Sequence, residues 1–148
     1  MTPPGAPQRP VPRGALLALR ATSTLLAVLT LAQATFAGSF LTGRYEMLMV
    51  HSTNAMVLAA LALGQFLFGA ALRLLGYGPL WLVVRPLLVA VAIGAQIALG
   101  FSRVLGVHVT LGVAISISVA FLSTAVWQTP LPPRADRARN VEPAGAAS

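Results

Sequence analysis

The chain has 148 residues, of which 57% are hydrophobic and only 9% are charged, and its formal net charge is +7. Soluble domains carry about a quarter charged residues. This composition and a mean hydropathy of +0.81 therefore exclude an ordinary soluble protein and predict a single domain in a lipid bilayer. The basic residues are all arginines, dispersed among apolar segments and both tails, so we interpret them as topology signals and expect no nucleic-acid partner. Without cysteine, the chain has no disulfide, thiolate metal site or iron–sulfur cluster.

The N-terminal segment 1–14 is rich in proline and carries two arginines, which predicts a disordered tail. The apolar run 15–41 is long enough to cross about 30 Å of hydrocarbon and predicts the first spanning helix. A cleaved signal peptide is the alternative interpretation, because a basic segment precedes the apolar run. The run continues through Phe36 and Phe40, well beyond a usual signal sequence. The sequence leaves open whether the first helix is retained.

Three further apolar segments predict spanning helices at 47–74, 80–101 and 104–127. Short turns at 42–46, 76–79 and 102–103 force neighbouring helices to run antiparallel. Within the third helix Ala90, Gly94 and Ala98 form a stripe of small residues on which a neighbour can pack closely. Prolines after residue 129 end the fourth helix, and 129–148 is expected to be a second disordered tail. The predicted fold is an all-α membrane protein, a four-helix antiparallel transmembrane bundle with disordered basic tails.

The arginines divide unequally between the two sides of this bundle. Four spans place both tails and the turn between helices two and three on one side, with eight arginines, whereas only Arg44 and Arg103 lie on the other. Cytoplasmic loops carry the excess of basic residues. We therefore expect a multi-pass protein of the cytoplasmic membrane with both termini in the cytoplasm.

The chain has two histidines, His51 and His108. Each lies near the outer start of its helix, and helices two and four run in the same direction, so both should lie roughly 7–9 Å from the outer turns. A metal between these helices could take one imidazole from each. Ala55 and Gly112 lie one turn further along and would leave space for a flat macrocycle.

This arrangement predicts b-type haem binding, with His51 and His108 as axial ligands of the haem iron. Arg44 and Arg103 lie just outside the histidines, where their guanidinium groups could pair with the propionates. A zinc or non-haem iron site is disfavoured, because Glu46 is the only acidic residue outside the C-terminal tail. The alternative is that the histidines are structural and bond to interfacial water or to polar neighbours across the bundle.

The segment from Gln96 to Gly100, followed by a short turn and then His108, Leu111 and Gly112, resembles the third-to-fourth helix hairpin of one four-helix half of the haem A synthase family. The resemblance extends over about 33–121, and Glu46 before His51 corresponds to an acid in that family. It implies that His51 and His108 are axial haem ligands on the outer side. The chain differs in the spacing from acid to histidine, in having Ser52 where the family has an arginine, and in having only one half. It is equally similar to small four-helix integral membrane proteins that share this histidine layout.

Two functions follow from the sequence. The first is a small cytochrome b-like protein that transfers an electron or handles haem at the outer membrane face, with a membrane redox partner or a second copy of itself. The second is a non-catalytic membrane scaffold or accessory subunit with structural histidines. Neither function identifies a reaction, so catalytic residues are not assigned.

Overall fold

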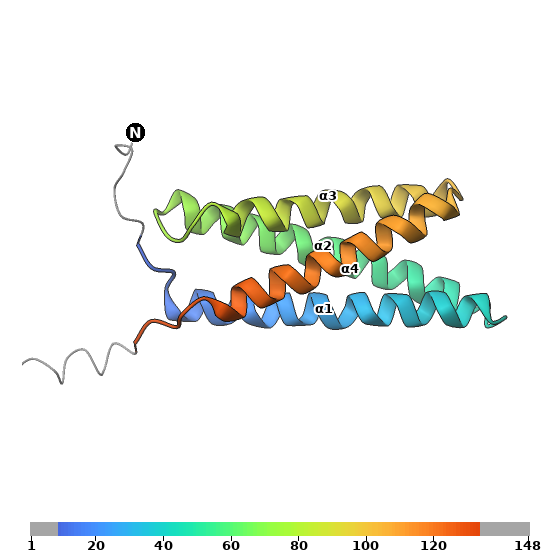
Figure 1. Ribbon diagram of the computed structural model, residues 1–148, viewed down its shortest axis with the longest axis horizontal. Coiled ribbons are helices and arrows are strands. Elements are labelled where there is room, and N and C mark those ends of the chain that lie inside the picture. The colour runs from blue at the N-terminus through green and yellow to red at the C-terminus, as the bar shows by residue number, and fades with distance from the viewer. Residues whose placement is uncertain (1–8, 134–148) are drawn as a thin grey trace, which may run out of the picture.

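A computed structural model describes residues 9–133 and contains four helices over this range: α1 (Arg13–Leu41), α2 (Met47–Leu74), α3 (Trp81–Phe101) and α4 (Leu105–Gln128). The four helices lie side by side as an antiparallel bundle, with the turns α1–α2 and α3–α4 at one end (Figure 1). The predicted all-α bundle is confirmed, and every helix boundary lies within two residues of its expected position. Each helix packs against two neighbours, while the diagonal pairs α1/α3 and α2/α4 have no Cα atoms within 8 Å of each other in the described chain.

All four helices are long and apolar enough to cross a membrane. Only 22–28% of the most apolar stretch of each helix is buried inside the bundle. The remaining apolar surface faces outward, where water could not accommodate so large an area. A lipid bilayer is the environment that this surface fits.

One local motif ends α1, α2 and α3. The first residue beyond each C-cap has a positive φ angle: Gly43 at 96°, Gly76 at 82° and Arg103 at 56°. In each case its backbone N–H and the next one bond back to two carbonyls of the last helical turn. This is the Schellman arrangement, which usually requires glycine. Arg103 takes the glycine position in the α3–α4 turn.

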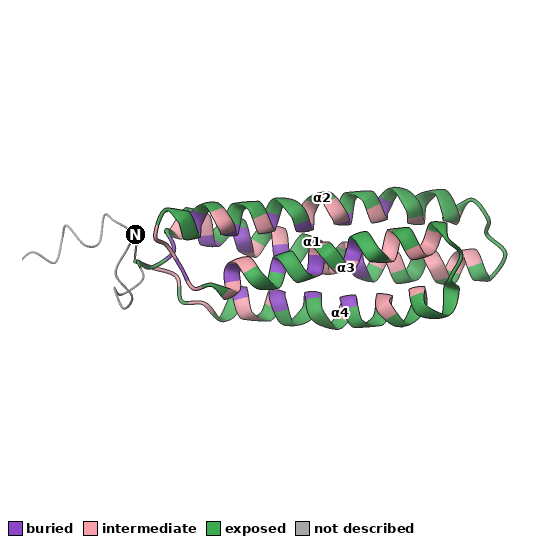
Figure 2. Ribbon diagram, turned by 90° about the horizontal axis from the view of Figure 1, so that it is seen from above, coloured by how far each residue is buried: buried purple, intermediate pink, exposed green. Residues whose placement is uncertain are grey.

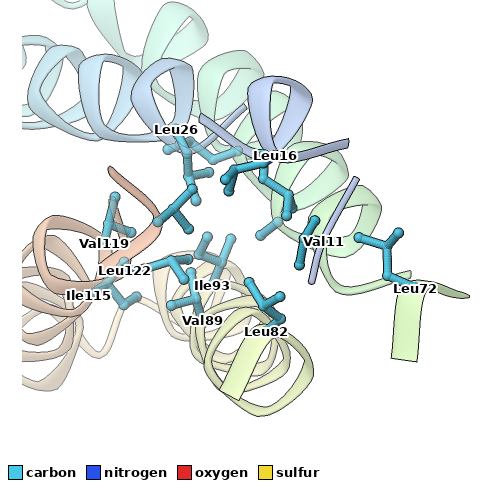
Figure 3. Close-up of a cluster of buried hydrophobic side chains, with 14 residues drawn as sticks. Val11, Leu16, Leu26, Leu72, Leu82, Val89, Ile93, Ile115, Val119 and Leu122 are labelled. Carbon is cyan, nitrogen blue, oxygen red and sulfur yellow. The ribbon is translucent and has the colours of Figure 1, made fainter. Parts of the chain in front are cut away.

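The buried apolar side chains gather in one half of the bundle. They include Leu16 and Leu26 on α1, Leu82 and Val89 on α3, and Val119 on α4, which converge between the helices (Figure 3). No residue in 31–53 or 94–114 is buried, and Figure 2 shows the same contrast along the bundle axis. Within residues 9–133, the end that carries the α1–α2 and α3–α4 turns therefore has no buried apolar side chains.

Part of the expected N-terminal tail is ordered, so the prediction of disorder is wrong for 9–14. The Arg9 backbone bonds to Gly76 and Gly78, its guanidinium group stacks on Tyr77 at 4.7 Å, and Val11 is buried. Helix α1 begins at Arg13. Backbone hydrogen bonds and the burial of one valine thus order this segment although its composition is rich in proline. Residues 1–8, also part of that expected tail, lie outside the described chain.

The start of the expected C-terminal tail is likewise held against α1. Arg20 donates to the carbonyl oxygens of Trp127 and Thr129 at 3.0 and 2.8 Å, and Arg13 donates to the carbonyl of Pro132 at 3.2 Å. The Trp127 indole donates to the Thr24 hydroxyl at 3.0 Å. Residues 134–148 of that tail lie outside the described chain.

The small-residue stripe on α3 does not serve as a packing face inside the chain. Ala90 packs beside the apolar core, but Gly94 and Ala98 are exposed, and a Cβ on Gly94 would meet nothing within 4 Å. The expectation of close packing is therefore wrong for two of the three positions, because the stripe turns away from the neighbouring helices.

Candidate functional site: a histidine pair across the bundle

His51 on α2 and His108 on α4 point toward each other across the centre of the bundle. Their ring centres lie 6.2 Å apart, and the ring planes are tilted by 52°. Because α2 and α4 are diagonal partners whose Cα atoms stay more than 8 Å apart throughout, the two side chains must project inward to come this close. The structure thus brings together two residues separated by 57 positions in the sequence.

Each histidine is held by the helix that precedes it. His51 Nδ1 lies 3.2 Å from the backbone oxygen of Gln33 on α1, and His108 Nδ1 lies 2.9 Å from the backbone oxygen of Gln96 on α3. A carbonyl oxygen only accepts hydrogen bonds, so the proton of each ring sits on Nδ1. Each Nε2 then carries a lone pair. Metal-binding histidines commonly have this tautomer and this backbone anchor.

The two halves of the site differ at their glutamine side chains. The Gln33 amide nitrogen lies 3.1 Å from His51 Nε2 and 3.0 Å from the His51 carbonyl oxygen. The Gln33 amide oxygen accepts a 2.6 Å bond from Asn54, which also donates to the Leu29 carbonyl. A small network of α1 and α2 groups therefore caps the Nε2 lone pair of His51.

No equivalent cap covers His108. Within residues 9–133 the Gln96 side-chain amide makes no hydrogen bond, and its Oε1 is buried without a partner. The Gln96 side-chain amide lies beside Gly112 on α4, and a Cβ added to Gly112 would come within 3.0 Å of the amide nitrogen of Gln96. The His108 Nε2 lone pair is thus the uncapped one of the two, and an unsatisfied amide lies nearby on α3.

Glycine makes room for the His108 ring, but at a position that the sequence did not indicate. A Cβ on Gly100 would come within 3.1 Å of His108 Cε1 and 3.3 Å of Nδ1. The space beside Gly112, expected to admit a macrocycle, is shared with the Gln96 amide instead. Ala55 is half-buried on α2.

The two arginines lie in the turns at the end of the bundle nearest the histidines. Arg44 forms an ion pair with Glu46 at 3.1 Å, and both side chains are 62% exposed. A hydrogen bond from its own backbone amide, and then the Arg44 contact, hold the pKa of Glu46 below its usual value. Arg103 is exposed in the α3–α4 turn. In the described chain neither guanidinium group contacts a histidine, so their role toward propionates stays a prediction.

The histidine pair is not part of a larger cluster of metal-ligating side chains in the described residues. The part of the chain from 9 to 133 has no group of three or more His, Cys, Asp or Glu residues that could hold a metal ion. Two imidazoles alone do not fill the coordination shell of zinc or non-haem iron. They do supply the two axial positions that a bis-histidine haem leaves to its protein.

The sequence pointed to the histidines but not to the residues that orient them. Gln33 precedes His51 by 18 residues and Gln96 precedes His108 by 12, and neither spacing is typical of a hydrogen-bonded pair. The structure shows what the two glutamines share, because each glutamine backbone anchors the following histidine.

Comparison of the chain with models of known protein families, with curated proteins and with solved structures finds no match. The resemblance to half of haem A synthase therefore stays a prediction from the sequence. The class of protein that the fold defines is a four-helix multi-pass membrane protein.

Proposed function

We propose that the protein binds one b-type haem between α2 and α4, with His51 and His108 as its two axial ligands. The observation that carries the proposal is the separation of 6.2 Å between the imidazole ring centres. Two metal–nitrogen bonds of about 2 Å, with half an imidazole ring on each side, require ring centres roughly 6 Å apart. The ring-centre separation of the pair thus fits a bis-imidazole metal site, and Nε2 of His51, now 3.1 Å from the Gln33 amide nitrogen, would have to exchange that contact for the metal.

The state of the ring nitrogens supports the same proposal. With Nδ1 anchored on a backbone carbonyl in both rings, each neutral imidazole offers Nε2 as the ligand atom. No residue in 31–53 or 94–114 is buried, so the interior around the histidines is lined by the half-buried polar side chains of Gln33 and Gln96 and by the buried Asn54, without a buried apolar side chain in these ranges. A flat apolar group between the diagonal helices would complete that interior.

The proposed activity is one-electron transfer or haem handling. A bound haem supplies a reversible redox couple. The chain's own contribution would be to hold the group through His51 and His108 and to surround it with apolar helices that limit water access. Electrons would pass to a membrane redox partner or to a second copy of the chain.

We further propose that the site faces the outer side of the cytoplasmic membrane. Eight arginines lie in the tails and near the α2–α3 turn, and two lie in the turns at the histidine end. This bias favours cytoplasmic termini. Trp81 and Trp127 lie near the arginine-rich end, where a membrane interface suits their amphipathic rings.

A structural role for the histidines is the second candidate, and one observation favours it. Both ring nitrogens of His51 are engaged, Nδ1 by the Gln33 carbonyl and Nε2 by the Gln33 amide. Such bonds would stabilise an α1–α2 hairpin in a scaffold or accessory subunit that binds no cofactor. His108, with an uncapped Nε2, fits this role less well.

Titration of the purified protein with haem distinguishes the two candidates. The protein is produced with an affinity tag that contains no histidine and is titrated in detergent while its absorption spectrum is recorded. We expect saturation at one haem per chain with a six-coordinate low-spin spectrum. His51→Ala and His108→Ala should each lose that spectrum, whereas Ser52→Ala, an exposed neighbour of His51, should retain it. A colourless protein, or one whose spectrum survives both histidine substitutions, would contradict the proposal.

A further inference from the structure

A groove of about 800 Å³ lies between α3 and α4, separate from the histidine pair. On α4 it extends from Leu111 to Gln128, about 26 Å at 1.5 Å per residue, and on α3 from Arg85 to Ala92. Apolar side chains such as Leu88 and Phe121 form most of its lining. The groove opens on the outward surface of the bundle, which in a bilayer is in contact with lipid.

The polar groups of the groove gather at its arginine-rich end. Arg85, Thr124 and Gln128 all line it there, within a few residues of the helix ends that carry Trp81 and Trp127. The opposite part of the lining is apolar, apart from the Ser118 hydroxyl, which bonds to the Ala114 carbonyl of its own helix. One polar end and a long apolar remainder match the shape of a phospholipid rather than that of a water-soluble ligand.

Arg85 is positioned to receive an anion. Its guanidinium group stacks over the Trp81 ring at 5.2 Å, and within residues 9–133 it has no hydrogen-bond or ion-pair partner. Arg13 and Arg20, in contrast, donate to carbonyl groups at the end of α4. The only described acidic residue, Glu46, pairs with Arg44 at the far end of the bundle. The charge at this end of the groove is therefore positive and uncompensated by the described chain.

We propose that this groove binds one anionic phospholipid, with an acyl chain along α3 and α4 and the headgroup phosphate on Arg85. Guanidinium groups bind phosphate through paired, charge-assisted hydrogen bonds. The Trp81 ring restricts the arginine to the membrane interface, where a headgroup phosphate lies. Gln128 offers a second donor from α4. This site is independent of haem binding and of the histidines.

Lipid retention tests the site. The full-length protein is reconstituted in nanodiscs of equimolar phosphatidylglycerol and phosphatidylcholine with matched acyl chains, extracted into detergent, and analysed by native mass spectrometry. We expect one retained phosphatidylglycerol per chain. Arg85→Gln should reduce its retention about ten-fold, the effect of losing a hydrogen bond to a charged group.

Two variants separate a built site from a general charge effect. Arg73→Gln removes the same charge at the same end of the bundle but does not line the groove, and it should leave retention unchanged. Ala114→Phe keeps every charge but fills the groove, and it should reduce retention as strongly as Arg85→Gln does. Equal losses in the two arginine variants, no preference for phosphatidylglycerol, or normal retention in Ala114→Phe would each overturn the proposal. A chain that forms a dimer through this face and retains no lipid would also overturn it.

Discussion

Gln33 is the residue that most distinguishes the two histidines. Its backbone oxygen anchors His51 as the backbone of Gln96 anchors His108. Only Gln33, however, also donates its side-chain amide to the histidine Nε2. A ligand that takes Nε2 of His51 must first break that bond, whereas His108 is available at once. The order of ligation that this predicts is His108 first and His51 second.

Substitution of Gln33 tests this order. Gln33→Leu keeps the backbone anchor and removes the cap, whose net contribution is about 1 kcal/mol. We expect the rate of haem association to rise about five-fold, measured by stopped-flow absorption.

Gln96→Leu is the matched control for the cap. It alters the corresponding residue of the other hairpin, whose amide makes no hydrogen bond in the described chain, so the association rate should change little. If both variants bound haem faster by the same factor, the loss of any polar side chain near the histidines would be enough to raise the association rate, and the cap on His51 would not explain it. If Gln33→Leu left the rate of haem association unchanged, the Gln33 amide would not limit access to Nε2 of His51.

Sequence alone could not have distinguished these glutamines. The pattern of residue types indicates which face of a helix turns inward, but a backbone carbonyl is present at every position and carries no signal of its role. The difference between Gln33 and Gln96 depends on side-chain rotamers and on Asn54, whose amide holds Gln33 in place. Such contacts depend on the relative placement of helices to within a fraction of an ångström.

At the level of the helices, α2 and α3 come close together at Gly69. A Cβ added to the buried Gly69 would collide with the backbone oxygen of Leu82. Backbone cannot yield as a flexible side chain does, so the two helices would have to separate. Gly69 thus allows α2 and α3 to pack closely next to the turn that joins them.

Gly69→Ala should therefore destabilise the protein by about 1–3 kcal/mol, the usual cost of overpacking. Thermal unfolding in detergent, followed by circular dichroism, measures the effect as a lowered Tm. Gly64 is the control in the same helix, because a Cβ there would meet nothing within 4 Å. Gly64→Ala should leave Tm unchanged or raise it slightly, since alanine favours helix. Similar Tm values for the two variants would argue against the close approach at Gly69.

The helix boundaries were predictable from hydropathy and turn residues, and the observed ends differ by at most two residues from those expected. The Schellman ends at Gly43 and Gly76 contain the glycine that makes such ends recognisable. Arg103 in the same conformation was not predictable, because a bulky residue rarely adopts a positive φ angle. Nor could hydropathy indicate that Gly94 and Ala98 face away from the bundle.

Across the whole molecule, the interior has two unlike halves. Buried apolar side chains fill the half nearest the chain ends, and the half around the histidines contains none (Figure 2). The number and direction of the helices could be predicted because each span is long and strongly apolar. The uneven distribution of buried apolar side chains along the bundle could not be predicted, because it depends on small departures of each helix from the bundle axis.

Orientation in the membrane can be tested with single cysteines, since the natural chain has none. Thr42→Cys lies in the exposed α1–α2 turn, and Leu75→Cys lies in the exposed α2–α3 turn. With cytoplasmic termini, a membrane-impermeant maleimide added to intact cells should label Thr42→Cys and spare Leu75→Cys. Both should react after the membrane is opened. The reverse labelling pattern would place the histidine pair at the cytoplasmic face.

Low-temperature electron paramagnetic resonance of the oxidised, haem-loaded protein measures most directly whether the two histidines hold a haem. It reports the axial ligands of ferric haem and not merely the presence of colour. Ligation by His51 and His108 predicts a low-spin signal typical of two imidazole ligands, converted to a high-spin signal when either histidine is replaced by alanine. A high-spin signal in the natural protein, or a low-spin signal that persists in both variants, would contradict a haem held between α2 and α4.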